Sequence, residues 1–135
     1  MSIFIDTSGF IAVLDMDEAN HHEAAKIWMD ILMSEDTLVT TNYVLVETVA
    51  LVQNRLGMRA IKVFQEDIVP AIRIEWIDEA MHQTAMGIML AAARKRLSLV
   101  DCASFETMRL FEITTAFTLD KHFKEQGFMC LPAKK

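Results

Sequence analysis

Short apolar runs alternate with longer helical stripes along the whole chain. A short apolar run bounded by polar residues indicates a buried strand, whereas apolar residues that recur at i, i+3, i+4 and i+7 indicate a helix. The runs predict strands at 2–5, 38–40, 72–77, 113–117 and 128–131. Because helical segments separate these strands, the pattern predicts an α/β fold with a central parallel sheet flanked by helices.

The helical pattern is clearest at 20–34, where apolar side chains recur at helical spacing. Further helices are predicted at 42–56, 58–68, 79–95, from Ser98 onward and at 120–126. Gly57 and Pro70 are typical helix stops, and Asp78 is placed to cap the helix that follows it.

The pattern also predicts how two of the helices pack and how the first strand ends. The helix 42–56 is apolar on nearly all sides, which predicts that it is buried. The Ala- and Met-rich face of 79–95 is expected to join the core. A polar turn at 6–9 is expected to connect the first strand to the apolar stretch 10–14.

Four acidic residues interrupt this pattern: Asp6, Glu47, Asp101 and Asp120. Each lies within or at the end of an apolar segment, where a carboxylate is costly unless it is paired or binds a metal. Asp6 and Asp120 follow predicted strands, and open parallel sheets bind ligands beyond the carboxyl ends of their strands. Glu47 and Asp101 lie in early turns of helices that can face the same edge. Carboxylates gathered there repel one another unless a divalent cation neutralises them, which predicts a metal-dependent phosphodiester hydrolase.

Each acid also has a purely structural interpretation. Asp6 and Asp120 can cap the helices that follow them, and Ser98 with Asp101 fits a capping box. Glu47 fits no cap and has apolar neighbours. The functional prediction therefore rests on the occurrence of all four acids in one small chain.

The composition is that of a globular protein and fits a single domain over residues 1–135, since 53% of the residues are hydrophobic and 24% are charged. The formal net charge of −6 argues against a protein that coats nucleic acid nonspecifically, which would be basic. Basic residues form two groups: Arg55, Arg59 and Lys62, and Arg94, Lys95 and Arg96. Either group can contact phosphates, and any one residue can equally be part of a solvated helix end.

The sequence predicts a cytoplasmic protein without membrane contact. Its first residues lack the basic start and long apolar stretch of a secretory signal, and no apolar run is long enough to span a bilayer. Cys102 and Cys130 lie in apolar stretches and form no metal-type pair. They are expected to be free buried thiols in a reducing compartment.

The segments that carry the four acids resemble the motifs of PIN-domain nucleases. Residues 5–8, 41–47, 99–103 and 118–123 are similar, in this order, to the first, second, third and fourth motifs of the family. The resemblance spans nearly the whole chain, whose length is similar to that of VapC-type toxins of bacterial and archaeal toxin–antitoxin pairs. It implies an endoribonuclease that depends on Mg²⁺ or Mn²⁺ and is built on a central parallel sheet.

The resemblance also implies roles for the acids. Asp6 and Asp101 would be direct metal ligands, because Mg²⁺ takes few carboxylates and keeps several waters. Glu47 and Asp120 would bind through water, hold a second ion or orient the attacking water.

Two hydroxyl residues and one histidine complete this set. Thr118 matches a hydroxyl residue of the family and, like Ser8, would position a water or a neighbouring carboxylate; both can equally be local turn hydroxyls. His122 stands where some relatives carry a further acid, so the number of metal ions stays open.

Partners follow from the resemblance alone. It implies an RNA substrate, a homodimer and a cognate antitoxin whose C-terminal segment blocks the acids. An apolar groove with an acidic floor would suit an antitoxin Arg or Lys. Transfer, ribosomal and messenger RNA all fit as targets, and so does a housekeeping role in RNA processing.

The main alternative is a catalytically silent PIN-like scaffold or protein-binding module, against which four intact acids argue. A haloacid-dehalogenase phosphatase requires an acid where Ser8 stands, and a receiver domain requires an adjacent early acidic pair that is absent. With four glycines in the chain, a phosphate-binding glycine loop is excluded. The His21-His22 pair lacks a partner at zinc spacing and is interpreted as surface.

Overall fold

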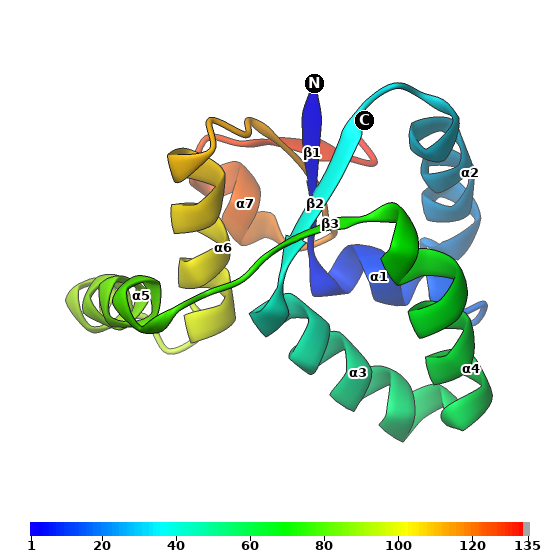
Figure 1. The fold of residues 1–135 in the computed structure, drawn as a ribbon, viewed down its shortest axis with the longest axis horizontal. Helices are drawn as coiled ribbons and strands as arrows, with labels where there is room; N and C mark the ends of the chain where they lie inside the picture. The colour runs from blue at the N-terminus through cyan, green and yellow to red at the C-terminus, as the bar shows by residue number, and fades with distance from the viewer. Residues whose placement is uncertain (134–135) are drawn as a thin grey trace.

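A five-stranded parallel sheet forms the centre of the computed structural model, which describes residues 1–133 (Figure 1). The strand order is β3-β2-β1-β4-β5. The strands are β1 (Ser2–Ile5), β2 (Thr37–Thr41), β3 (Arg73–Glu75), β4 (Thr115–Phe117) and β5 (Met129–Leu131). In the register of the central strands, Phe4 lies between Val39 of β2 and Ala116 of β4. The predicted α/β fold with a parallel sheet is confirmed.

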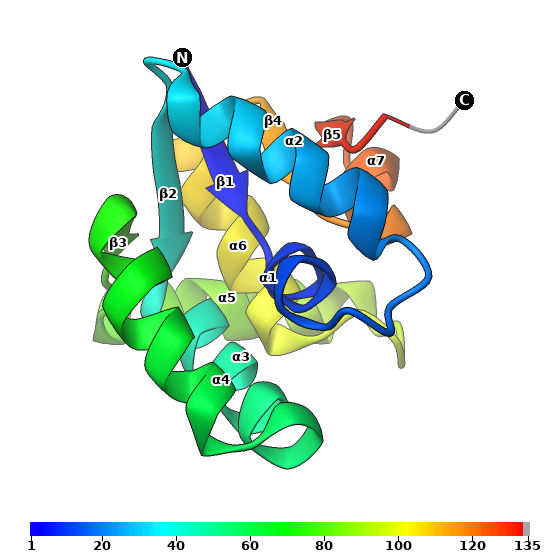
Figure 2. The ribbon, with the colours of Figure 1, turned by 90° about the vertical axis from the view of Figure 1, so that its right-hand side faces the viewer.

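Helices cover both faces of this sheet, with α1 and α2 on one side and α6 and α7 on the other (Figures 1 and 2). The helices are α1 (Thr7–Leu14), α2 (His21–Met33), α3 (Asn42–Leu56), α4 (Met58–Val63), α5 (Glu79–Ala92), α6 (Leu99–Leu110) and α7 (Lys121–Glu125). One π turn, η1 (Phe64–Ile68), and one 3₁₀ turn, η2 (Val69–Ala71), connect α4 to β3.

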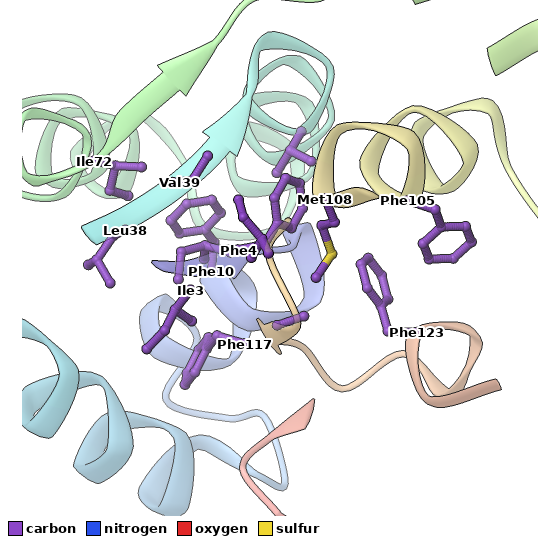
Figure 3. Close-up of a cluster of buried hydrophobic side chains, with 14 of the residues drawn as sticks. Ile3, Phe4, Phe10, Leu38, Val39, Ile72, Phe105, Met108, Phe117 and Phe123 are labelled. Carbon is purple, nitrogen blue, oxygen red and sulfur yellow. The ribbon is translucent and has the colours of Figure 1, made fainter. Parts of the chain in front are cut away.

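Alternate residues of the central strands supply the two halves of the core (Figure 3). Phe4 stacks on Phe123 of α7, with ring centroids 6.3 Å apart. Phe117 instead contacts Trp28 of α2 on the opposite face, at 5.8 Å. This alternation follows from the period of two in a strand, and it explains why strands buried on both faces are apolar at nearly every position.

Several predicted boundaries are corrected. The residues 6–9 do not form a turn, because α1 begins at Thr7 directly after the strand. The predicted strand 72–77 is limited to β3, and the helix 79–95 ends at Ala92 with Ala93 in the left-handed region. The predicted helix 58–68 is α4 followed by the π turn.

The predicted burial is wrong for α3 and correct for one face of α5. The bounds of α3 match the predicted 42–56, but its side chain Val46 is 71% exposed, so the helix buries one face only. The Ala- and Met-rich face of α5 does join the core, since Ala85 is buried in it and Ile88 and Met89 pack against it. An apolar composition therefore did not distinguish a core helix from one with an exposed apolar face.

Within residues 1–133, no helix is both long and apolar enough to cross a membrane. Cys102 is buried and Cys130 half-buried, and no disulfide joins them. Burial raises the pKa of the Cys102 thiol. The single domain predicted for 1–135 includes residues 134 and 135, which lie outside the described residues.

Candidate active site

The site lies where the strand order reverses. The chain leaves β1 towards β2 on one side and returns as β4 on the other, so the carboxyl ends of β1 and β4 open into a crevice, the usual ligand position in such sheets. Asp6 follows β1, and its backbone N–H donates to the carbonyl of Phe117 at the end of β4, at 3.1 Å. This contact holds the two strand ends at a fixed distance.

Gly9 allows the first turn of α1 to pack against the end of β4. A Cβ atom at this position would lie 2.5 Å from the carbonyl oxygen of Phe117 and 2.4 Å from its ring. Backbone cannot move aside as a flexible side chain can. The glycine is therefore needed to place the residues around Asp6 beside β4.

The carboxylate of Asp6 is 3% exposed and is held by two hydroxyl groups. Ser8 Oγ donates to Asp6 Oδ2 at 2.9 Å, and Thr118 Oγ1 donates to the same oxygen at 3.0 Å. Both hydroxyls also accept backbone N–H groups, from Leu119 and Asp120 respectively. The capping interpretation is wrong for Asp6, because its side chain makes no capping hydrogen bond to α1.

Asp101 and Asp120 do cap helices. Asp101 Oδ2 accepts the N–H of Ser98, which completes the predicted capping box at the start of α6. Asp120 Oδ1 accepts the N–H of His122 at the start of α7. These caps fix the two carboxylates at helix N-termini, where the positive end of the helix dipole stabilises negative charge.

Glu47 reaches the site from α3. Thr41 caps this helix by accepting the N–H of Val44, and Thr48 donates to Thr7 of α1 at 3.4 Å. Glu47 therefore lies one residue before a buried contact between the two helices. Its side chain is half-buried rather than enclosed in the core.

All four predicted acids line one cavity of about 440 Å³. Ser8 lines it as well, whereas Thr118 does not and contacts it only through Asp6 and Ser8. The cavity thus joins residues from β1–α1, α3, the start of α6 and the β4–α7 connection. Sequence reasoning selected these residues from their separate positions, and the fold brings them together.

The pKa values of Asp6 and Asp101 are both raised, by burial and by a neighbouring carboxylate. Burial raises the pKa of Asp6 from 3.8 to about 7; the hydroxyl of Ser8 opposes this shift, and the charge of Asp101 adds to it. Burial also raises the pKa of Asp101, with a further contribution from the charge of Asp120. Burial and neighbouring charge therefore disfavour the ionisation of Asp6 and Asp101 without a compensating cation.

A divalent cation fits the donor set chemically, since every acid offers oxygen and Mg²⁺ needs few protein ligands besides water. Among residues 1–133, no three Asp, Glu, His or Cys side chains are already arranged to hold an ion together. All four carboxylates nevertheless line the same cavity.

Three charged residues that line the cavity were not predicted as site residues: Glu18, Arg55 and Arg96. Glu18 lies in the polar α1–α2 connection, where a carboxylate is ordinary. Arg55 and Arg96 each belong to one of the two basic groups noted in the sequence, and nothing in the sequence separates them from their neighbours.

His122 does not line the cavity, but its charge opposes the rise in the pKa of Asp101. It is buried, and its Nδ1 lies 3.3 Å from Glu125 Oε2, a contact that lowers the pKa of Glu125. The histidine therefore supports α7.

A sequence model of the PIN domain matches residues 3–129. This chain belongs to the PIN-domain family. The PIN domain described here is 29% identical over 128 residues to the 23S rRNA-specific endonuclease VapC20 of Mycobacterium tuberculosis, covering 94% of this chain and 95% of that protein. The predicted family is confirmed.

Solved structures agree with this assignment. The crystal structure of VapC20, described as a sarcin–ricin loop cleaving toxin, matches the PIN domain with a TM-score of 0.83 at 29% identity, covering 94% of this chain and 96% of that one. FitAcB from Neisseria gonorrhoeae shares the fold at 17% identity, with a TM-score of 0.68 and 96% of each chain covered. VapBC2 from Rickettsia felis, solved with a DNA fragment from its promoter, shares it at 11% identity, with a TM-score of 0.64 over 96% of this chain and 97% of that one.

Proposed function

We propose that this PIN domain is a divalent-metal-dependent endoribonuclease that acts as the toxin of a VapBC-type toxin–antitoxin pair. The observation that carries the proposal is the meeting of Asp6, Glu47, Asp101 and Asp120 in one cavity at the sheet's switch point. The fold and sequence shared with VapC20, an endonuclease specific for 23S rRNA, support the same reaction class. For this reason 23S rRNA and its sarcin–ricin loop are the first RNAs to test.

The four carboxylates are proposed to have different roles. Asp6 and Asp101, whose pKa values are raised by burial, are the proposed direct ligands of the cation. When bound, the cation supplies an acidified water and neutralises charge at the scissile phosphate. Glu47 and Asp120 orient the attacking water or hold the hydrated side of the ion.

Ser8 and Thr118 are proposed as positioning residues. Both hydroxyls donate to Asp6 Oδ2, so they would hold the carboxylate in one orientation towards a bound cation. Their backbone contacts tie this arrangement to the β4–α7 connection, which also carries Asp120. Such outer contacts are known to orient metal ligands and to change their affinity.

The proposal is tested by incubating labelled sarcin–ricin loop hairpin and an unstructured oligoribonucleotide with purified protein in Mg²⁺, Mn²⁺ or EDTA. Cleavage is expected with either cation and not with EDTA. Asp6→Asn should reduce the rate at least about 1,000-fold, since it removes a metal ligand that is worth several kcal/mol in the transition state. Asp67→Asn, an exposed residue outside the cavity, is the matched control. An Asp6→Asn variant with full activity would refute the proposed site.

The antitoxin is proposed to bind along α1, α3 and α4. A second cavity of about 470 Å³ is lined mainly by apolar residues, among them Leu14 of α1 and Leu56 of α3. These follow Ile11 and Arg55 of the acid cavity, so the two cavities are neighbours along both helices. A basic antitoxin residue can then enter the acid cavity from an apolar anchor. Leu56→Glu is expected to escape inhibition by a co-expressed antitoxin while retaining cleavage.

A homodimer and a cytoplasmic location complete the proposal. Large apolar side chains remain exposed on α3, on the β3–α5 connection and on α5: Val46 at 71%, Trp76 at 72% and Leu90 at 71%. Tyr43 of α3 bonds to His82 of α5, so these elements are adjacent. Sedimentation should give the mass of a dimer for the wild type and of a monomer for Trp76→Glu. The substrate RNA and the antitoxin are both expected in the cytoplasm.

A further inference from the structure

Two arginines face the acid cavity from different elements. Arg55 lies in the last turn of α3, on the same stripe as Glu47 and Leu51, and Arg96 lies in the α5–α6 connection, two residues before the cap of α6. Both line the cavity, yet both side chains are exposed. Figures 1 and 2 place the end of α3 and the α5–α6 connection apart from each other. The cavity is therefore flanked by positive charge on two sides.

Neither guanidinium is neutralised by the protein. Within residues 1–133, the cations that form ion pairs are the N-terminal amine, Arg73, Arg94 and His122. Arg94, two residues from Arg96, is paired with Glu125 at 3.2 Å. Arg55 and Arg96 keep their donors free although five carboxylates line the same cavity.

The two arginines can offset the repulsion between this acidic protein and an RNA strand. The chain carries a net charge of −6, and the cavity holds more acids than bases, so both repel a polyanion. A guanidinium binds phosphate oxygens through two parallel hydrogen bonds and is always charged. Unpaired arginines on two sides of the carboxylates offer such contacts to the strand on either side of the cleaved bond.

We propose that Arg55 and Arg96 bind two backbone phosphates of the substrate RNA, one on each side of the phosphodiester that lies at the carboxylates. The inference rests on the proposed ribonuclease function and adds the residues that hold the substrate strand. The two contacts exist in the bound substrate and persist in the transition state. They therefore contribute to binding, whereas the carboxylates contribute to the chemical step.

Cleavage kinetics of the sarcin–ricin loop hairpin test this assignment, with single and double alanine variants of the two arginines. Each single variant should raise KM about tenfold and leave kcat nearly unchanged, because a charge-assisted phosphate contact is lost equally from substrate and transition state. The double variant should raise KM about 100-fold, since sites that lie apart add. Each lost arginine should also reduce the salt dependence of kcat/KM by about 0.7 in the log–log slope for single-stranded RNA.

Lysines of the same two basic groups provide matched controls. Lys62 and Lys95 are exposed and do not line the cavity, so Lys62→Ala and Lys95→Ala remove the same charge nearby and should leave KM unchanged. Arg55→Lys and Arg96→Lys should keep the salt dependence but recover only part of the affinity, because a lysine cannot form the paired contact.

Three outcomes would overturn the inference. Unchanged KM in both arginine variants of an active enzyme contradicts it directly. An equal rise in the lysine controls shows a general effect of charge instead. If the wild-type protein neither binds nor cleaves RNA, the proposed function is wrong, and this inference fails with it. In the first two outcomes the wild type is active, and only the inference fails.

Discussion

The inner end of the cavity, at Asp6, differs in burial from the rim, which consists of Glu47, Arg55 and Arg96. At the inner end, Asp6 is buried, held by two hydroxyls and carries a raised pKa. At the rim, Glu47 is half-buried, and Arg55 and Arg96 are exposed and make no ion pair. The hydrogen bonds thus fix the Asp6 carboxylate before any ligand binds, and its burial lowers the stability of the folded protein. The rim residues lower the stability little and are free to contact a substrate.

Stability against pH gives the largest expected difference between the two regions. Asp6 holds its proton in the folded state up to about pH 7, whereas its reference value is 3.8. Between these values the folded protein keeps a proton that the unfolded chain has lost. The free energy of unfolding therefore falls as pH rises from about 4 to about 7, by at most about 4 kcal/mol.

Urea unfolding of the wild type and of Asp6→Asn in EDTA measures this effect. The variant should lack this part of the slope and should be the more stable protein at pH 8. Added Mg²⁺ should stabilise the wild type at pH 8 and not the variant. A parallel pH profile for the two proteins would contradict the buried charge at the inner end.

Gly9→Ala tests the packing that supports the inner end. The added Cβ would meet the backbone of β4, so α1 must move away from Phe117. We expect a loss of about 3 kcal/mol in the free energy of unfolding, measured by thermal melting, together with a large loss of cleavage. Gly87→Ala is the matched control, because a Cβ at that helical position meets nothing within 4 Å. Equal stability of the two variants would contradict the close approach.

The rim should respond in the opposite way. Glu47→Gln is expected to lower kcat about 10- to 100-fold, because a water-orienting carboxylate is lost. Its free energy of unfolding should change by no more than about 0.5 kcal/mol, as is usual for a partly exposed side chain outside the core. Kinetics and urea unfolding on the same preparation check both values. A strongly destabilised variant would place Glu47 with the inner end instead.

Thr118→Val separates positioning from metal binding and has the smallest expected effect. Valine keeps the shape but removes one donor to Asp6 and one acceptor for the N–H of Asp120. The Mg²⁺ concentration needed for half-maximal cleavage should rise about tenfold, in line with other outer contacts of metal ligands. Thr118→Ser restores the hydroxyl and should restore this concentration. If serine fails to do so, the effect is one of packing.

The same division explains what the sequence could predict. The strands, the parallel sheet and the inner end follow from local patterns, because Asp6 stands directly after an apolar run that predicts a strand and Asp120 follows another such run after a short loop. Asp101 was visible as a carboxylate within the apolar segment 99–103, although its capping box offered a structural alternative. These features are encoded within a few residues, so a single sequence suffices to find them.

Three other charged residues of the cavity cannot be identified from local sequence patterns. Glu18, Arg55 and Arg96 look like any solvated charge until the tertiary fold brings them to the same cavity from different elements. The burial of α3 was overestimated for a related reason, since Val46 is exposed on a face that the apolar pattern assigned to the core. Which apolar face is covered depends on neighbouring elements, and no local pattern contains that information.

Calorimetric titration of Mn²⁺ into the purified protein measures whether Asp6 and Asp101 bind a divalent cation. Saturable binding is expected for the wild type and for Asp67→Asn, with protons released to the buffer near pH 7 as Asp6 ionises. Binding should be weakened at least about tenfold in Asp6→Asn and in Asp101→Asn. Equal Mn²⁺ binding by all four proteins, or none by the wild type, would show that these carboxylates do not form the metal site.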